Sequence, residues 1–259
     1  MFVDLIQRTI NILGYSIVKV SPDVQILNLL NRLKPVQVDL IRVGGDGDGG
    51  YLIPDDINGI ERCFSPGTSD IANFESEMLE RNIPCYLADG SVDKPPISHP
   101  KLFFEKKFVG TVESEDTLDF QKWIESNSNS GEDLILQMNI EGSEYACILG
   151  CDVKVLNQFR VIVVEFHFLE KIFDQKIFPI FRDTFLKLLD NYHVVHIHPN
   201  NSGGLMRVRG IEIPRTMEFT FLRKDRVAEV KHAARFPHPL DRKSVLTKPD
   251  FPLPRSWYF

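Results

Sequence analysis

Two short segments place polar residues where a nucleoside could bind. In the first, IERCFSPGTSDIANFESEML (60–79), an apolar strand runs into a turn that holds Ser65, Gly67, Ser69 and Asp70, and a helix follows. Glycine lets the backbone approach a ligand closely, and the start of a helix offers unpaired N–H groups. The turn lacks the G-x-G-x-x-G pattern of dinucleotide sites. An ordinary capped turn, with Asp70 as the N-cap, is therefore the alternative interpretation.

The second segment, YLADG (86–90), ends the next strand and carries Asp89 about 22 residues beyond Gly67. A carboxylate at that place can accept hydrogen bonds from both ribose hydroxyls of a nucleoside. Alone, Asp89 would be a turn residue before Gly90. Together the two segments favour a nucleoside site, and the missing phosphate-cradling glycines point away from NAD.

A further group of ionisable residues lies late in the chain. Glu165 and His167 end the apolar run VIVVEFHF, and residues two apart in a strand point to one face. His196 and His198 end the following strand. A buried acid needs a partner or a task, because burying an unpaired charge is costly. Histidines at strand ends can also simply bond to backbone groups. A metal-dependent sugar enzyme that uses Glu165, His167 and His198 is another interpretation.

The segment GGDGDGGY (44–51) is rich in glycine and aspartate. It resembles half of a calcium-binding loop, but the complete D-x-D-x-[DN]-G spacing and the later Glu are absent. A flexible turn is the simpler interpretation.

The elements that must position these residues follow from the pattern of apolar runs. LILQM (134–138) and VIVVEF (161–166) are continuously apolar, as strands buried on both faces of a parallel sheet are. Alternating strands and helices predict a doubly wound α/β sheet. MEFTFL alternates and indicates an antiparallel edge strand. Expected strands are 38–43, 60–65, 85–88, 102–104, 134–138, 161–166, 193–198 and 217–222; expected helices are 22–33, 70–82, 116–126, 143–149 and 175–190.

The ends of the chain differ from its middle. Residues 2–13 predict a short amphipathic helix, and Ser21 can cap a second helix whose apolar face would hold Val24, Leu27, Leu30 and Leu33. The tail from residue 226 is rich in proline, which predicts an extended path, yet it carries aromatic anchors such as Trp257. The expected organisation is an N-terminal helical extension (1–35), a catalytic domain (36–225) and a tail packed on the core (226–259).

Composition excludes some classes of function. The 259 residues hold 30 Lys and Arg against 36 Asp and Glu, a net charge of −6. A protein that holds nucleic acid or anionic lipid by bulk charge is not expected at this balance. The four cysteines are too few for a disulfide scaffold and have no partners for a zinc site, which favours buried thiols and a reducing cytosol. Neither a signal peptide nor an apolar run of about 20 residues is present.

The segment MNIEGSEYACIL (138–149) resembles the D-I-E-G-x-E signature of the FkbM-type methyltransferases, which use S-adenosylmethionine. RVGGDGDGGYLI, FSPGTSDIANFE, VVEFHFL and PRTMEFTFLRKD are also similar to members of that family, so the resemblance covers most of the chain. It implies a class I, Rossmann-like fold: a seven-stranded, mostly parallel sheet with its last strand antiparallel and helices on both faces. It also implies methyl transfer, commonly to a hydroxyl of a sugar or a glycosylated product.

The resemblance also implies roles for individual residues. The segment from Asp48 to Tyr51 would be a lid over the cofactor or acceptor. Asn139 stands where the signature usually has Asp, so it brings no negative charge to hold a cation. The resemblance and the residue patterns described above together give two sets. Residues expected to bind the cofactor are Ser65, Gly67, Ser69, Asp70, Asp89, Gly90 and Asn139; residues expected to bind the acceptor are Asp48, Gly49, Gly50, Tyr51, Glu165 and His198.

The activated methyl group of S-adenosylmethionine requires little more than an acceptor oxygen held in line with it. A general base would help, because a hydroxyl is a weak nucleophile. The candidates are His167, Glu141 and Glu144, with His167 favoured, so that activity should rise with pH through an imidazole pKa of about 6–7. A divalent metal is not favoured. A nucleoside- or sugar-binding protein without catalysis is the alternative from another class.

Overall fold

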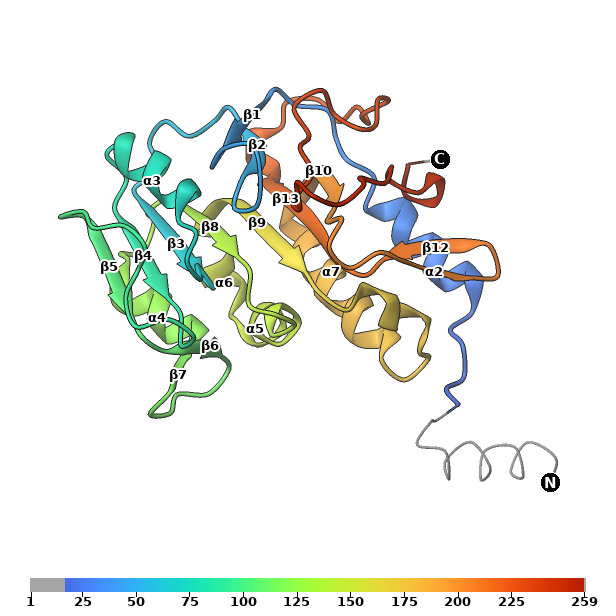
Figure 1. Ribbon diagram of the computed structural model, residues 1–259, viewed down its shortest axis with the longest axis horizontal. Helices are drawn as coiled ribbons and strands as arrows, with labels where there is room; N and C mark the ends of the chain where they lie inside the picture. Colours follow the sequence, from blue (N-terminus) through green and yellow to red (C-terminus); the bar gives the residue numbers. More distant parts are fainter. Residues whose placement is uncertain (1–16, 259) are drawn as a thin grey trace.

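The computed structural model describes residues 17–258, so the helix predicted over 2–13 lies outside the described residues. Its centre is a seven-stranded sheet with the order β10-β13-β9-β8-β3-β4-β5 (Figure 1). The strands are β3 (Arg62–Pro66), β4 (Cys85–Ala88), β5 (Leu102–Glu105), β8 (Leu134–Met138), β9 (Phe159–Phe166), β10 (Tyr192–Pro199) and β13 (Met217–Arg223). Each overlaps a predicted strand. The mostly parallel, seven-stranded α/β sheet expected from the sequence is therefore confirmed.

One strand of the sheet runs against the others. β13 is antiparallel to both β9 and β10, whereas β5, β4, β3, β8 and β9 are mutually parallel. The antiparallel direction of the MEFTFL strand was predicted, but its place at the edge is wrong, because β13 is inserted between β9 and β10. Its first six residues are all buried, as an interior position requires. The edge strand is β10.

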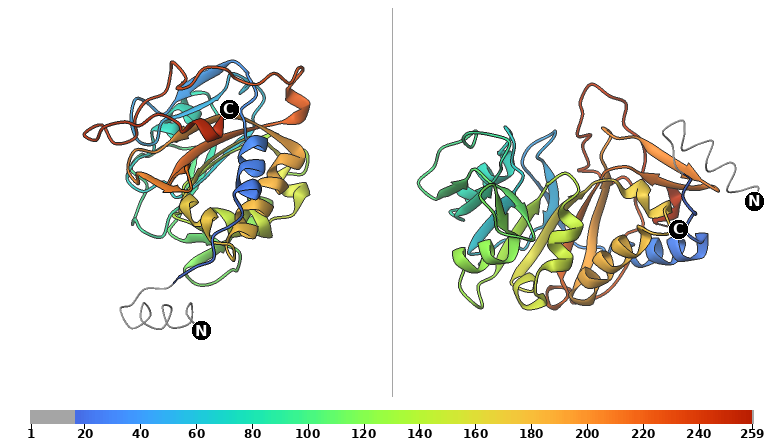
Figure 2. Two further views of the ribbon diagram at one scale, coloured as in Figure 1. Left: turned by 90° about the vertical axis from the view of Figure 1, so that its right-hand side faces the viewer. Right: turned by 90° about the horizontal axis from the view of Figure 1, so that it is seen from below.

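Helices cover both faces of the sheet (Figure 2). On one face, α3 (Asn73–Glu80) packs with Ile135, Val161 and Val163 of the central strands. On the other face lie α4 (Phe120–Asn127), α5 (Glu144–Gly150), α6 (Val153–Leu156) and α7 (Phe178–Asn191). The alternation of β8 and β9 side chains between the two clusters is the expected behaviour of strands buried on both sides.

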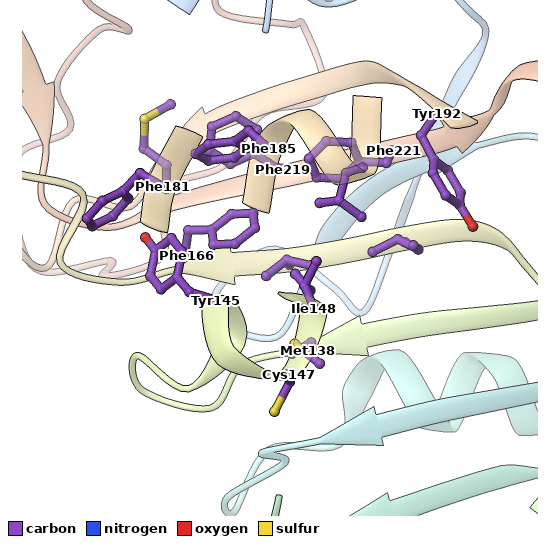
Figure 3. Packing of buried hydrophobic residues seen from close by; sticks show 14 of the residues in the cluster. Met138, Tyr145, Cys147, Ile148, Phe166, Phe181, Phe185, Tyr192, Phe219 and Phe221 are labelled. Carbon is purple, nitrogen blue, oxygen red and sulfur yellow. The ribbon is translucent and has the colours of Figure 1, made fainter. Parts of the chain in front are cut away.

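Aromatic side chains dominate the larger core (Figure 3). The Tyr145 ring lies against Phe166 and Phe181, with ring centroids 5.1 and 4.5 Å away. The Tyr145 hydroxyl donates to the carbonyl of His167 at 2.7 Å. The core thus holds the chain in place directly after β9, where ionisable residues follow.

The helix predicted over 22–33 is confirmed as α2 (Asp23–Arg32), but its buried face differs. Ile26, Leu29 and Leu30 are buried, while Val24 and Leu27 are exposed. Both sets have helical spacing, so periodicity alone does not choose between them. Ser21 does not cap the helix: its buried hydroxyl donates to the carbonyl of Ile172.

Short hairpins and the tail complete the structure. The Gly/Asp-rich loop joins β1 (Leu40–Val43) to β2 (Tyr51–Pro54), a strand that the sequence pattern missed. The Thr220 hydroxyl of β13 donates to the Leu52 carbonyl at 2.6 Å, which ties this hairpin to the sheet. The remaining elements are β6 (Phe108–Gly110), β7 (Thr117–Asp119), β11 (Leu205–Val208), β12 (Ile211–Pro214) and the 3-10 turns Leu169–Phe173, Lys224–Arg226 and Arg255–Trp257.

The Pro-rich tail lies along the core. Trp257 is completely buried, its ring packs near Phe219 of β13, and its indole N–H donates to the carbonyl of Glu212 at 3.2 Å. All four cysteines are buried free thiols. Within the described residues, no helix has the length and apolar character of a membrane span.

Candidate functional site

The turn after β3 brings the backbone of two strands into contact at Gly67. Its φ of +85° is a conformation that favours glycine. A Cβ at this position would lie 1.7 Å from the Asn139 carbonyl oxygen at the end of β8. No larger residue fits here without moving one of the two strand ends. The helix after the turn begins at Asn73, with Ala72 as its N-cap; Asp70, expected as the cap, is exposed and bonds to the Ser69 hydroxyl.

Asp89 follows β4 and is buried beside this turn. Its Oδ2 accepts a hydrogen bond from the Ser69 backbone N–H at 2.7 Å, and its Oδ1 accepts from the backbone N–H and hydroxyl of Ser91 at 2.7 and 2.6 Å. A carboxylate has about four acceptor positions. Asp89 therefore organises the turn and keeps acceptor capacity on Oδ2 for a ligand hydroxyl.

A cavity of about 300 Å³ opens next to Asp89. One part of its wall is polar, with Asp89, Ser69 and Ser91, and another part is apolar, with Val109 and Ile140. This volume and this mixture of walls are typical of small-molecule sites. Gly90 does not line the cavity, but a Cβ there would meet the Phe108 ring at 2.6 Å, so glycine lets that ring close the cavity.

A second, smaller cavity of about 80 Å³ lies across the contact between Gly67 and Asn139. Gly67, Ser69 and Asn139 line both cavities. The Oδ1 atom of Asn139 is buried and has no hydrogen-bond partner. An unsatisfied acceptor costs free energy unless a ligand or water reaches it. Asn139 thus lies between the two cavities and carries a buried amide oxygen without a partner.

The wall of the second cavity includes a buried polar network. The Ser65 hydroxyl contacts a carboxylate oxygen of Glu75 and lies 2.6 Å from Oε1 of Gln137. The Gln137 amide donates to the Tyr51 hydroxyl at 3.1 Å. Glu75, Gln137 and Tyr51 line the cavity together with Asp48 and Gly49 of the β1–β2 loop. Ser65, expected to bind a cofactor, lines neither cavity.

The β1–β2 loop, which the resemblance implied as a lid, reaches the second cavity. Asp48, Gly49 and Tyr51, a buried residue of β2, line the second cavity, whereas Gly50 packs against the backbone of Gly45. Partial burial and then the charge of Glu165 raise the pKa of Asp48.

Three carboxylates surround His167, directly after β9. Nδ1 lies 3.0 Å from Oε1 of Glu144, and Nε2 lies 3.3 Å from Oε1 of Glu165 and 3.5 Å from Oε2 of Glu141. Burial lowers the pKa of the imidazole, but the hydrogen bonds and charges of Glu144 and Glu165 outweigh burial and raise the pKa to about 10. His167 is thus protonated at neutral pH. The expected base with a pKa of 6–7 is not what this environment produces.

Glu165 is fixed from two sides. One oxygen faces His167 and the other accepts from the Asn200 side chain at 2.8 Å. Glu144 is completely buried; its Oε1 also accepts from the Ile140 backbone N–H, while its Oε2 has no partner.

His198 does not join this cluster. His196 and His198 share Asp241 of the tail, at 2.8 and 3.5 Å. Burial lowers the pKa of His196; for His198, burial lowers the pKa, but Asp241 and Glu218 raise it to about 9. His198 lines neither cavity. In the described part of the chain, no group of three or more His, Cys, Asp or Glu residues is arranged to hold a metal ion, so the arrangement of Glu165, His167 and His198 as a metal site is wrong.

Sequence reasoning missed Glu75, Ser91, Phe108 and Asp241. Glu75 lies in the amphipathic pattern of α3 and reads as a surface acid. Asp241 lies 45 residues from His196, so no spacing could connect them. Ser91 lies two residues after Asp89, in the turn that the sequence already indicated.

Residues 74–193 match the model of the methyltransferase FkbM domain. The match confirms the resemblance expected from the sequence and includes Asp89, Asn139 and His167. It supports a methyltransferase. The search among curated proteins finds no match.

Solved structures show only distant similarity. One comes from work on the conversion of a disulfide bond into a thioacetal group during echinomycin biosynthesis: 12% identity, 64% of this chain and 77% of that chain covered, TM-score 0.33. Another is a candidate RNA methyltransferase, PH1948, from Pyrococcus horikoshii: 13% identity, 78% of this chain and 99% of that chain covered, TM-score 0.34.

Proposed function

We propose that this chain is an S-adenosylmethionine-dependent O-methyltransferase whose acceptor is a hydroxyl of a sugar or of a glycosylated small molecule. The observation that carries the proposal is the junction of the two cavities at Gly67 and Asn139, beside the FkbM-domain match. There, a backbone contact that only glycine permits and an unsatisfied buried oxygen lie beside the carboxylate of Asp89.

The residues present fit the cofactor. The free acceptor capacity of Asp89 Oδ2 suits a ribose hydroxyl, and the apolar wall at Val109 and Ile140 suits an adenine ring. The unpartnered Oδ1 of Asn139 suits a donor from the amino-acid end. When bound, the cofactor supplies a methyl group on a positively charged sulfur, which needs no further activation.

The rest of the site supports an acceptor with hydroxyl groups. Asp48 lines the smaller cavity and Glu141 lines the larger one, and the carboxylate of each can accept from a hydroxyl. Asp48 stands at the rim with a raised pKa, so it is the carboxylate best suited to take the proton that the acceptor loses. His167, held as a cation, orients Glu144 and Glu165 and balances their charge.

Isothermal calorimetry with S-adenosylhomocysteine tests the cofactor site. We expect the wild-type chain to bind it and not NAD, and Asp89→Asn to bind it at least tenfold more weakly, the effect of about 1.5 kcal/mol in a charge-assisted hydrogen bond. No binding by the wild type would contradict the proposal as a whole.

Methyl transfer is then followed by mass spectrometry with a panel of small glycans and nucleotide sugars. Transfer to a hydroxyl supports the proposal. Transfer only to amine or thiol acceptors would contradict O-methylation, and cofactor binding without any transfer would favour a binding protein that lacks catalysis.

A further inference from the structure

Glu75 is a completely buried carboxyl group that faces a cavity without a cationic partner. It projects from α3 and lines the smaller cavity, on the other side of the Gly67–Asn139 junction from Asp89. Among the described residues, no cation is among the groups that shift its pKa. Its side-chain contact is the Ser65 hydroxyl. Buried carboxylates are ordinarily paired with a cation, because the charge is costly to desolvate.

Glu75 has one side-chain hydrogen-bond donor, and that donor is shared. The Ser65 hydroxyl donates toward a carboxylate oxygen of Glu75 and also toward Oε1 of Gln137, whose amide N–H donates to Tyr51. A hydroxyl carries a single hydrogen, so it cannot satisfy both acceptors at once. Burial, opposed by the hydrogen bonds from Ser65 and from the Glu75 backbone N–H, raises the pKa of Glu75 to about 7.

The cavity arrangement assigns this carboxyl group a ligand. We propose that Glu75 binds the ammonium group at the amino-acid end of S-adenosylmethionine and S-adenosylhomocysteine. The inference rests on the proposed function. Asp89 lines only the larger cavity and Glu75 only the smaller one, so a nucleoside beside Asp89 places its amino-acid end toward Glu75, past Asn139. The ammonium group replaces the carboxyl proton as the counter-charge, and the displaced proton leaves to solvent. Ser65 and Gln137 act as positioning residues that hold the carboxyl group in place.

The contact between Glu75 and the ammonium group can be tested by comparing two ligands that differ in the amino-acid end. 5′-Methylthioadenosine keeps the nucleoside and the thioether sulfur but has no ammonium group. Calorimetry on the full chain should show that Glu75→Gln weakens S-adenosylhomocysteine at least tenfold and changes 5′-methylthioadenosine less than twofold. Asp89→Asn should weaken both ligands. Glu80→Gln, an exposed acid on the same helix, should change neither.

A second measurement uses only the wild-type chain, so that its result does not depend on whether a variant folds. An analogue of S-adenosylhomocysteine with hydrogen in place of the amino group should bind the wild-type chain at least tenfold more weakly than the parent. Equal affinity for parent and analogue, or an equal effect of Glu75→Gln on both nucleosides, would overturn the inference while leaving the proposed function intact. Failure of the wild type to bind either nucleoside would instead overturn the proposed function, and this inference with it.

Discussion

Two buried carboxyl groups on opposite faces of the sheet have opposite electrostatic surroundings. Glu144, on α5, is completely buried 3.0 Å from the imidazole of His167, whose pKa is raised to about 10. Glu75, on α3, is nearly as enclosed, but its hydrogen-bond partners are the Ser65 hydroxyl and its own backbone N–H, and neither is a cation. The first charge is balanced within the chain and stabilises the folded state. The second is not balanced and is best explained by a ligand. The comparison separates a carboxylate that holds the site together from one that recognises a bound molecule.

The largest expected change in stability concerns His167, the cation beside Glu144. His167→Ala leaves Glu144 and Glu165 without their cation, and removal of one partner from a buried ion pair costs about 3–5 kcal/mol. Because the folded pKa of His167 lies above the ordinary value, its stabilisation is full below about pH 6.5 and is lost as the pH rises through about 10. Urea denaturation at pH 6.5 and 10.5 measures this loss, with His99→Ala as the exposed control. An equal loss at both pH values would show that His167 contributes packing and not charge.

Replacement of Glu75 should stabilise the ligand-free protein, whereas replacement of His167 should destabilise it. Glu75→Gln keeps an oxygen that can accept from Ser65 and removes the titration. A folded-state pKa of about 7 means that the ligand-free wild type loses stability as the pH rises from about 4.5 to 7. The variant should therefore be more stable than the wild type by about 2–3 kcal/mol at pH 8 and equally stable at pH 4. Thermal denaturation without ligand checks this; lower stability of the variant at pH 8 would mean that Glu75 has a purely structural partner.

The smallest expected effect concerns the tail, which balances charge at the sheet edge. Burial raises the pKa of Asp241, but His196 and His198 outweigh burial and hold it well below its usual range. The pair stabilises the fold above about pH 4 and below about pH 6.5, and the His198 contribution is lost as the pH rises through about 9. Asp241→Asn should cost about 1–2 kcal/mol at pH 6 and less at pH 9.5. Melting temperatures at the two pH values measure the difference, and an unchanged value at pH 6 would contradict the pairing.

The strands and most helices could be predicted because their signals are local. The apolar runs LILQM and VIVVEF predict strands that are buried on both faces. The helix predicted over 22–33 agrees with α2 to within one residue at each end. Periodicity does not say which face of a helix is buried, so Val24 and Leu27 were misplaced. The alternation of MEFTFL predicts a strand but not its place in the sheet, because strand order depends on pairing between segments that are far apart in the sequence.

Some residues of the candidate site could be predicted from local sequence, and others could not. Asp89 and Gly67 stand out in the sequence because a strand end, an acid and a glycine at fixed spacing suit a nucleoside. Glu75 has no such signal, since an acid on an amphipathic helix is ordinarily solvated. Its importance arises only when α3 packs its carboxyl group against Ser65.

By itself, the sequence determined the class of sheet, the strand–turn–helix that forms the floor of the site, and the resemblance to the FkbM methyltransferases, because these depend on short-range pattern and residue type. The tertiary structure alone decided the protonation of the site. His167 became a cation because the turn after β8 and the end of β9 bring Glu144 and Glu165 within 3.3 Å of it. The pKa of Glu75 rises to about 7 because the fold buries its carboxyl group. Charge states depend on which groups meet at what distance and in how much water, and no linear spacing contains that information.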